Sequence, residues 1–186
     1  MARKKKNFSK LGLGIALVVL GAILISGRYQ IATNLGTSFA DEPVEVSGFT
    51  IAEVDEGKLP ERIVIPGISI DLAVEKAQIK GGYWEVFSES AGWGEGSGIP
   101  GEVGNQVIFA HAREGLFLPL KKIEVGMRVY VFTESDWYSY EVIEIKEVFP
   151  NQTEVIEPTE DERLTLYTCS GFTDSKRLIV VAKRVR

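Results

Sequence analysis

Cysteine and histidine are almost absent from this 186-residue sequence, which has one of each, Cys169 and His111. A single cysteine excludes an intramolecular disulfide, and the pair cannot supply the four ligands of an ordinary structural zinc site. A lone cysteine is most often a small buried hydrophobic residue. Outside the cytoplasm, however, a free thiol is a reactive liability unless it has a chemical task. The sequence around Cys169 has to decide between these two interpretations.

Acidic residues are missing from residues 1–40, which carry six cations. The whole chain has a formal net charge of −5, so without those six positive charges the rest of the chain carries −11. An acidic body argues against a nucleic-acid partner, because binding to phosphates needs a basic face. Hydrophobic residues make up 45% of the chain and charged residues 25%, which fits a globular domain with an appended segment.

The basic tail, residues 1–10, precedes an uncharged apolar run at residues 11–27. This run is at the short end for a bilayer-spanning helix, and its basic flank predicts that the tail stays in the cytoplasm. We therefore expect a single-pass transmembrane anchor at 11–27, an extracytoplasmic linker at 28–58 and a folded domain at 59–186. A cleaved signal peptide is the alternative, although the nearest small-residue cleavage site, at 38–40, is distant from the run.

From residue 59 onward, short β-like segments alternate with glycine and proline. The pattern indicates about eight strands and little helix, and therefore an all-β domain that is either a closed barrel or a sandwich. A helical turn or two is expected at 116–123, limited by a proline. Strands are expected at 62–65, 68–72, 83–86, 106–111, 128–132, 137–148, 163–169 and 177–184.

Two stretches depart from simple alternation. Within 137–148 the apolar phase shifts between Val142 and Ile143, which predicts a β-bulge or a sharp bend. The glycine-rich residues 92–104 are expected to form a long connection with Trp93 exposed, and residues 149–162 are expected to form an acidic loop.

Three segments place reactive side chains at predicted strand ends: 105–111 ends on His111, 164–169 ends on Cys169, and 177–182 begins with Arg177. Strand ends beside loops hold a group rigidly and still admit a substrate. A thiol with a pKa of about 8.5 and an imidazole with a pKa of about 6.5 can form an ion pair, and the imidazole can later protonate an amine. A permanently charged guanidinium can stabilise an oxyanion, so these three groups suffice for acyl transfer.

These segments resemble the sortase family of cysteine transpeptidases. Its TLxTC motif matches residues 165–169, which read Thr-Leu-Tyr-Thr-Cys. Its histidine ends a pattern G-N-x-V-I-x-x-H, as in residues 104–111, and its arginine opens the strand after the cysteine, as Arg177 does. The resemblance covers about residues 59–186.

The resemblance implies a closed eight-stranded sortase-type β-barrel with short helices, preceded by the transmembrane helix. It implies cleavage of an LPxTG-like sorting signal and transfer of the acyl group to an amine of a peptidoglycan precursor or a pilin, at the outer side of a Gram-positive cell membrane. Cys169 would be the nucleophile, His111 the general acid and base, and Arg177 the oxyanion stabiliser, while Thr168 would bind substrate. The absence of an aromatic-Asp lid motif before the barrel favours a compact housekeeping-like or class D/E-like member.

Plainer interpretations exist for each residue taken alone. His111 could be a structural histidine and Arg177 a solvated charge at a strand end; their joint occurrence in motif order favours catalysis. Some sortases bind calcium in the region of the acidic loop, but a solvated loop is the favoured interpretation, so no cofactor is expected and calcium is the alternative.

Two other functions fit parts of the pattern. An L,D-transpeptidase also uses cysteine and histidine at the cell wall, but its motif has S-x-G before the cysteine, whereas Tyr167 and Thr168 stand here. A non-catalytic surface binding module on the same barrel is the second alternative, and the complete Cys, His and Arg set argues against it.

Overall fold

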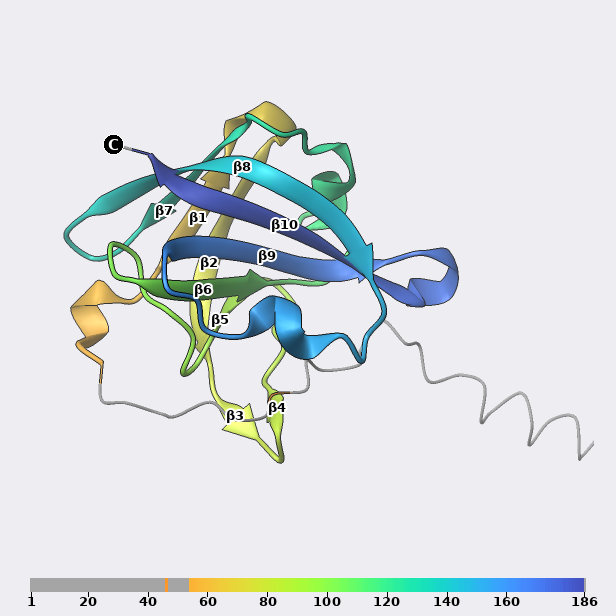
Figure 1. Ribbon diagram of the computed structural model, residues 1–186, viewed down its shortest axis with the longest axis horizontal. Helices are drawn as coiled ribbons and strands as arrows, with labels where there is room; N and C mark the ends of the chain where they lie inside the picture. Colours follow the sequence, from red (N-terminus) through yellow and green to blue (C-terminus); the bar gives the residue numbers. More distant parts are fainter. Residues whose placement is uncertain (1–45, 47–53, 186) are drawn as a thin grey trace, which may run out of the picture. The chain divides into compact units, whose positions relative to one another are not determined.

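Eight strands close into a barrel in the computed structural model, which describes residue 46 and residues 54–185 (Figure 1). The order around the barrel is β1-β2-β5-β6-β9-β10-β8-β7. Two neighbouring pairs, β2 with β5 and β6 with β9, are parallel, and the other pairs are antiparallel. The prediction of a closed eight-stranded barrel is thus confirmed and the sandwich is excluded. The strands are β1 (Arg62–Ile65), β2 (Ile70–Ala77), β5 (Ala91–Gly94), β6 (Gly104–Phe109), β7 (Arg128–Phe132), β8 (Trp137–Val148), β9 (Glu162–Ser170) and β10 (Lys176–Val185).

Short elements join the barrel strands. A two-stranded sheet forms from β3 (Ile79–Lys80) and β4 (Tyr83–Trp84) and projects below the barrel in Figure 1. Among residue 46 and residues 54–185, no helix is long and apolar enough to cross a membrane, and the anchor predicted at 11–27 lies outside these residues. The 3₁₀-helices are η2 (Glu56–Lys58), η3 (Pro66–Ile68), η4 (Leu118–Lys122), η5 (Thr153–Ile156) and η6 (Phe172–Asp174).

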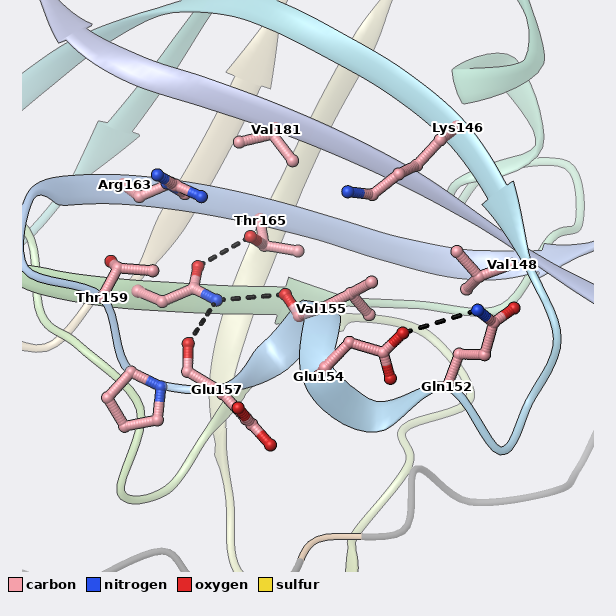
Figure 2. Close-up of a pocket in the computed structure, with 12 residues that line it drawn as sticks. Lys146, Val148, Gln152, Glu154, Val155, Glu157, Thr159, Arg163, Thr165 and Val181 are labelled. Atoms are coloured by element: carbon pink, nitrogen blue, oxygen red, sulfur yellow. Dashed lines mark hydrogen bonds between the residues drawn. The ribbon is translucent and has the colours of Figure 1, made fainter.

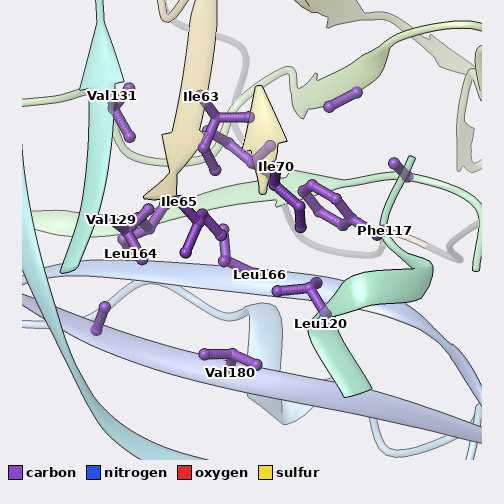
Figure 3. Close-up of a cluster of buried hydrophobic side chains, with 14 of the residues drawn as sticks. Ile63, Ile65, Ile70, Phe117, Leu120, Val129, Val131, Leu164, Leu166 and Val180 are labelled. Carbon is purple, nitrogen blue, oxygen red and sulfur yellow. The ribbon is translucent and has the colours of Figure 1, made fainter. Parts of the chain in front are cut away.

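Alternating side chains divide the buried apolar residues into two clusters. The first, the inner core, draws residues from all eight barrel strands and fills the barrel; Ile63, Leu166 and Val180 belong to it (Figure 3). The second, here called the outer cluster, contains the intervening residues of β6, β9 and β10, such as Tyr167 and Ile179. Part of the outer face of these three strands is therefore covered, and the covering side chains include Trp84 of β4 and Ile156 of η5.

The bulge predicted in the long strand β8 is confirmed. Val181 of β10 pairs with Glu144, but Ala182 pairs with Val142, so Ile143 is an extra residue with no partner in the ladder. Its side chain is 41% exposed. An added residue of this kind reverses the faces of the residues that follow, which is why the apolar pattern of the sequence changes phase there.

The expectation for Trp93 is wrong. Residues 91–94 form strand β5, and the indole of Trp93 is only 1% exposed in the inner core, with its Nε1–H donating to the carbonyl of Gly98 at 2.9 Å. The glycines beside it serve close packing rather than a turn: a Cβ at Gly92 would meet the ring of Phe109 at 2.9 Å. The exposed tryptophan is instead Trp137, at 60%.

Packing against the barrel extends into the segment predicted as a linker. Val46 is buried in the outer cluster, and its N–H donates to the carbonyl oxygen of Gly82 at 2.8 Å. Val54 packs against the inner core. Residues before 59 therefore contribute to the folded domain.

Candidate active site

Cys169 and Arg177 lie directly opposite each other on neighbouring strands. They are antiparallel partners across β9 and β10, although eight positions separate them in the sequence. Side chains of such a pair lie on the same face of the sheet, with Cβ atoms about 4.5–5.5 Å apart. Cys169 is 8% exposed. The sheet therefore places Cys169 and Arg177 side by side on one face.

His111 comes two residues after the end of β6, the strand that runs parallel to β9. Phe109 pairs with Tyr167, and Ala110 stays in this register because its N–H donates to the carbonyl of Tyr167 at 3.4 Å. One further step brings His111 to the level of Cys169. Because Phe109 belongs to the outer cluster, continued alternation through the two residues after β6 would turn His111 to the outer face as well.

The other two predicted catalytic residues, Cys169 and Arg177, lie on the outer face. Cys169 comes two residues after Tyr167, and Arg177 comes two residues before Ile179, and both reference residues belong to the outer cluster. The fold thus gathers the cysteine, the arginine and the histidine at one end of β6, β9 and β10, on the side away from the barrel interior.

Thr168, between Tyr167 and Cys169, lies on the opposite, inner face. Its hydroxyl is buried and donates to the carbonyl oxygen of Ala110 at 2.7 Å. The hydroxyl is therefore hydrogen-bonded to the backbone carbonyl of the residue that precedes His111. Direct binding of substrate by Thr168 is still a prediction; because the hydroxyl proton is used by Ala110, the oxygen would take part as an acceptor.

Arg177 is buried by a short turn that follows the cysteine. Only 2% of the residue is exposed, and Nη1 donates to the carbonyl oxygens of Asp174 (2.8 Å) and Lys176 (3.1 Å). Asp174 has a left-handed φ of 58°, which turns its carbonyl within reach of the guanidinium. This burial excludes the solvated strand-end charge considered above, because removing a cation from water is costly unless the site uses it.

A pocket of about 320 Å³ lies on the same outer face, farther along β9 and β10 (Figure 2). Thr165 at its floor comes four residues before Cys169, a separation of about 13 Å along a strand. One wall is the segment from Gln152 to Thr159, and Lys146 and Val181 lie across from it in Figure 2. The candidate site therefore combines reactive groups at one strand end with a hollow about four residues away.

The far end of the barrel holds a polar network around Glu162. Its Oε1 accepts hydrogen bonds from the Tyr140 hydroxyl and the Gly101 N–H, each at 2.9 Å, and lies 3.7 Å from Nε of Arg184. Burial, followed by the negative charge of Glu162, raises the pKa of Tyr140 far above its usual value near 10. Glu162 thus has a structural role, and it lies at the opposite end of the strands from Cys169.

This raised pKa predicts a loss of stability in alkali. The protonated hydroxyl of Tyr140 contributes stability that is fully present below the unfolded pKa of about 10 and is lost as the pH rises above it. We expect the Tm of the wild-type chain to fall more steeply between about pH 9 and pH 11 than that of Tyr140→Phe. Tyr83→Phe, at an exposed tyrosine, should follow the wild type. Parallel curves for all three proteins would contradict the assignment.

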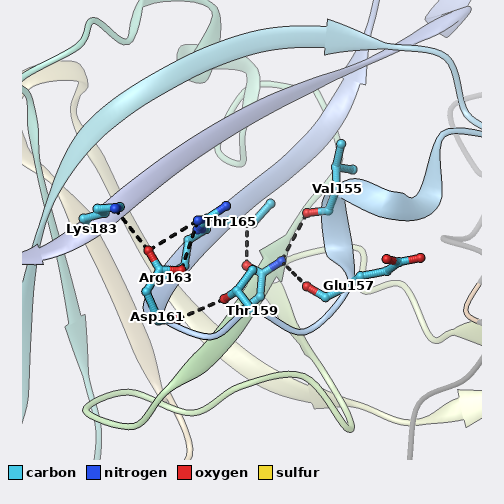
Figure 4. Close-up of polar contacts among 8 residues, drawn as sticks. Val155, Glu157, Thr159, Asp161, Arg163, Thr165 and Lys183 are labelled. Atoms are coloured by element: carbon cyan, nitrogen blue, oxygen red, sulfur yellow. Dashed lines mark hydrogen bonds and ion pairs between the residues drawn. The ribbon is translucent and has the colours of Figure 1, made fainter.

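The acidic loop does not assemble an evident cation site. Among residue 46 and residues 54–185, no three His, Cys, Asp or Glu side chains are grouped as metal ligands. Asp161 instead contacts Lys183 at 3.1 Å and Arg163 at 3.0 Å, and hydrogen bonding to Lys183 followed by the charge of Arg163 holds the pKa of Asp161 below its usual range (Figure 4). Asp161 is therefore held by two cations, and calcium binding by the loop is still an open alternative.

We therefore expect catalysis without a calcium requirement. Initial rates of peptide cleavage should agree within about twofold in excess EDTA and in millimolar calcium, because no carboxylate has to be gathered by the ion. Asp161→Asn serves as the control, and its rate should be equally insensitive to calcium. A rate that rises severalfold with calcium in the wild type, and no longer does so in Asp161→Asn, would overturn this expectation.

Sequence reasoning missed the polar residues that shape the pocket. Asn105 appears in the sequence only as a motif letter, yet its amide is buried and joins β6 to the pocket wall. Thr165 likewise counts as the first letter of TLxTC, but its hydroxyl donates to Oδ1 of Asn105 at 2.7 Å. The available signal was a polar residue at an outer-face position of an otherwise apolar strand.

Comparisons with known proteins agree with this architecture. The family described as "Sortase domain" matches residues 63–185. The chain is 34% identical to a protein named Sortase A from Streptococcus agalactiae serotype III (strain NEM316), over 98% of this chain and 89% of that relative. The solved structure of the pilus-related Sortase C of Group B Streptococcus has a TM-score of 0.61 and 25% identity, covering 87% of this chain and 91% of that one. Clostridium perfringens sortase C, solved with the C-terminal cell wall sorting motif, has a TM-score of 0.57 and 26% identity, covering 72% and 74%.

The closed barrel, its strand pairings and its similarity to these proteins define a protein of the sortase fold and of the transpeptidase class. The chain belongs to the sortase family. This membership removes the L,D-transpeptidase alternative. Because the matched proteins include a sortase A, sortases C and a sortase D5, the assignment to a housekeeping-like or class D/E-like member is still a prediction.

Proposed function

We propose that this protein is a membrane-anchored cysteine transpeptidase that cleaves an LPxTG-like sorting signal and transfers the acyl group to an amine of the cell wall or of a pilin subunit. The observation that carries the proposal is the pairing of Cys169 with a buried Arg177 on the outer face of the barrel. A guanidinium held by backbone carbonyls beside a thiol is suited to a reaction in which negative charge develops on a carbonyl oxygen.

The reaction would proceed in two acyl transfers. The Cys169 thiolate attacks the threonine carbonyl of the sorting signal, and Arg177 stabilises the oxyanion of the tetrahedral intermediate. The C–N bond then breaks, the departing amine takes a proton from His111, and a thioester is left on Cys169. An incoming amine attacks the thioester, gives its proton to His111 and releases the thiolate. Water in place of the amine gives hydrolysis.

The pocket supports a peptide substrate that lies along the outer face. An extended peptide advances about 3.3 Å per residue, so about four residues span the distance between Thr165 and Cys169. The residues before the scissile bond would therefore reach the pocket when the carbonyl is at the thiol. Clostridium perfringens sortase C was solved with the C-terminal cell wall sorting motif, which supports a sorting-signal peptide as the substrate of this chain.

Membrane attachment is proposed from the sequence alone. The basic tail at 1–10 and the apolar run at 11–27 support a single-pass anchor with its N-terminus in the cytoplasm and the barrel outside. Fractionation of cells that express the full chain tests it. The protein should sediment with membranes and resist carbonate extraction, and protease added outside protoplasts should degrade the barrel.

A cleavage and ligation assay tests the proposal as a whole. The full chain should cleave a fluorogenic peptide containing an LPxTG-like motif, and added triglycine should yield a ligated product. A sulfonate reagent that labels thiols should attach to Cys169 and abolish both reactions. A non-catalytic binding module, the remaining alternative, would bind the peptide without any turnover. Absence of turnover over a full library of sorting peptides would favour this alternative.

A further inference from the structure

Asn105 is a buried amide that joins β6 to the wall of the pocket. It is 2% exposed. Side chains alternate along β6, so Asn105 shares the outer face with Val107 and Phe109. Its Nδ2 donates two hydrogen bonds, to the carbonyl oxygens of Val155 (3.1 Å) and Glu157 (3.0 Å). Figure 2 shows both bonds crossing from the strand to the pocket wall.

The amide uses all of its polar atoms in one defined orientation. Both N–H donors are directed to the wall, and Oδ1 accepts the hydroxyl of Thr165 from β9 at 2.7 Å (Figure 4). The hydroxyl donor fixes which end of the amide is the oxygen, because a flipped amide would bring an oxygen against the two carbonyls. Thr165 thus sets the orientation in which Asn105 can hold the wall.

The held segment includes the end of a short 3₁₀-helix, η5. The two accepting carbonyls belong to residues on either side of Ile156, whose side chain is buried in the outer cluster. η5 is a single 3₁₀ turn with no side-chain cap, and such a turn has little intrinsic stability. Two apolar side chains, buried Ile156 and partly buried Val155, and the amide of Asn105 therefore hold the wall against β6 and β9.

We infer that Asn105, oriented by Thr165, is a positioning residue that keeps the 155–157 wall of the pocket in its peptide-binding position. The inference rests on the proposed function, because it assigns the pocket to the part of the sorting peptide that precedes the scissile bond. Asn105 lines the pocket and pairs with Arg163, which is six residues, or about 20 Å along the strand, from Cys169, so it acts on peptide binding and not on the reacting groups.

The test is a split between KM and kcat in variants of the full chain. Asn105→Ala removes both bonds to the wall and is expected to raise KM for a sorting peptide roughly tenfold, the equivalent of one to two ordinary hydrogen bonds. Thr165→Val, a milder change that keeps the two bonds, should raise KM by roughly two- to threefold. In both variants kcat and the rate of Cys169 labelling by a small sulfonate reagent should stay within about twofold of wild type.

Gln106→Leu is the matched control. Gln106 is the neighbouring buried amide, but its Nε2 and Oε1 have no hydrogen-bond partner among the described residues, and alternation directs it to the barrel interior. Its replacement should leave KM unchanged. A peptide shortened so that it ends before the pocket should give the same KM with Asn105→Ala as with wild type.

Hydrogen exchange separates failure of this inference from failure of the proposed function. Amides of residues 153–157 should exchange faster in Asn105→Ala than in wild type, and not in Gln106→Leu, whether or not any peptide is cleaved. Unchanged exchange in this segment, or a fall in kcat with KM unaltered, would refute the positioning role. A wild-type chain that cleaves no sorting peptide would instead refute the proposed function and leave the exchange result to decide on Asn105.

Discussion

Replacement of Cys169 by alanine is expected to reduce peptide cleavage by at least about a thousandfold, to the background of the assay. The chain contains no second thiol, so no other side chain can form the thioester. Because Cys169 is a small, largely buried residue at the end of β9, its loss should lower the free energy of unfolding by only about 1 kcal/mol. Initial rates and a thermal melt of the same preparation measure both quantities.

Cys169→Ser is the control for packing. The serine hydroxyl keeps the shape of the side chain but is a far weaker nucleophile than a thiolate, so this variant should melt close to wild type and still be inactive. If Cys169→Ala retained turnover in a preparation free of wild-type enzyme, the nucleophile would have to be another group and the proposed chemistry would be wrong.

Replacement of Arg177 by lysine should reduce kcat by roughly a hundred- to a thousandfold, the usual effect of removing one oxyanion donor. Lysine keeps the charge, but it cannot both donate to the carbonyls of Asp174 and Lys176 and present a further planar donor at the thiol. KM for the peptide should change little, because the interaction forms mainly in the transition state. Rates measured over a full range of concentrations of the fluorogenic peptide separate kcat from KM.

Arg184→Lys is the matched control, since Arg184 lies on the same strand at its other end. Its guanidinium is 4.7 Å from the ring centre of Tyr138 and 3.7 Å from Glu162, so it belongs to the polar network at the far end of the barrel. The control should lose some thermal stability and keep its kcat. The reverse outcome, an active Arg177→Lys and an inactive Arg184→Lys, would place the oxyanion stabiliser elsewhere.

The strand pattern was predictable where burial on one face leaves a period of two. The bulge is the clearest example, because an inserted Ile143 leaves a visible break in the apolar phase of β8. β5 was not predictable in this way, since glycines that let aromatic rings pack closely read as turn residues in the sequence. The exposure of Trp93 was predicted wrongly for the same reason. Its glycine neighbours suggest a flexible loop, but the rings of Phe109 and Trp84 pack against these glycines.

The candidate site was predictable in its composition but not in its layout. The motifs named the cysteine, the histidine and the arginine, but only strand register shows that Cys169 is paired with Arg177 and that both lie on the outer face. The buried state of Arg177 depends on the turn after β9, whose polar sequence predicts a turn but not the burial of the arginine that follows it. The amide of Asn105 escaped notice because its partners are backbone carbonyls about fifty residues away.

The most direct measurement is the intact mass of the full chain after brief incubation with a sorting peptide and acid quench. A thioester on Cys169 should add the mass of the peptide portion before the scissile bond, should map to the tryptic peptide that contains Cys169, and should disappear when triglycine is present. A cleaved peptide without any such adduct on the wild-type chain, or an adduct on a different residue, would contradict acyl transfer through this sulfur.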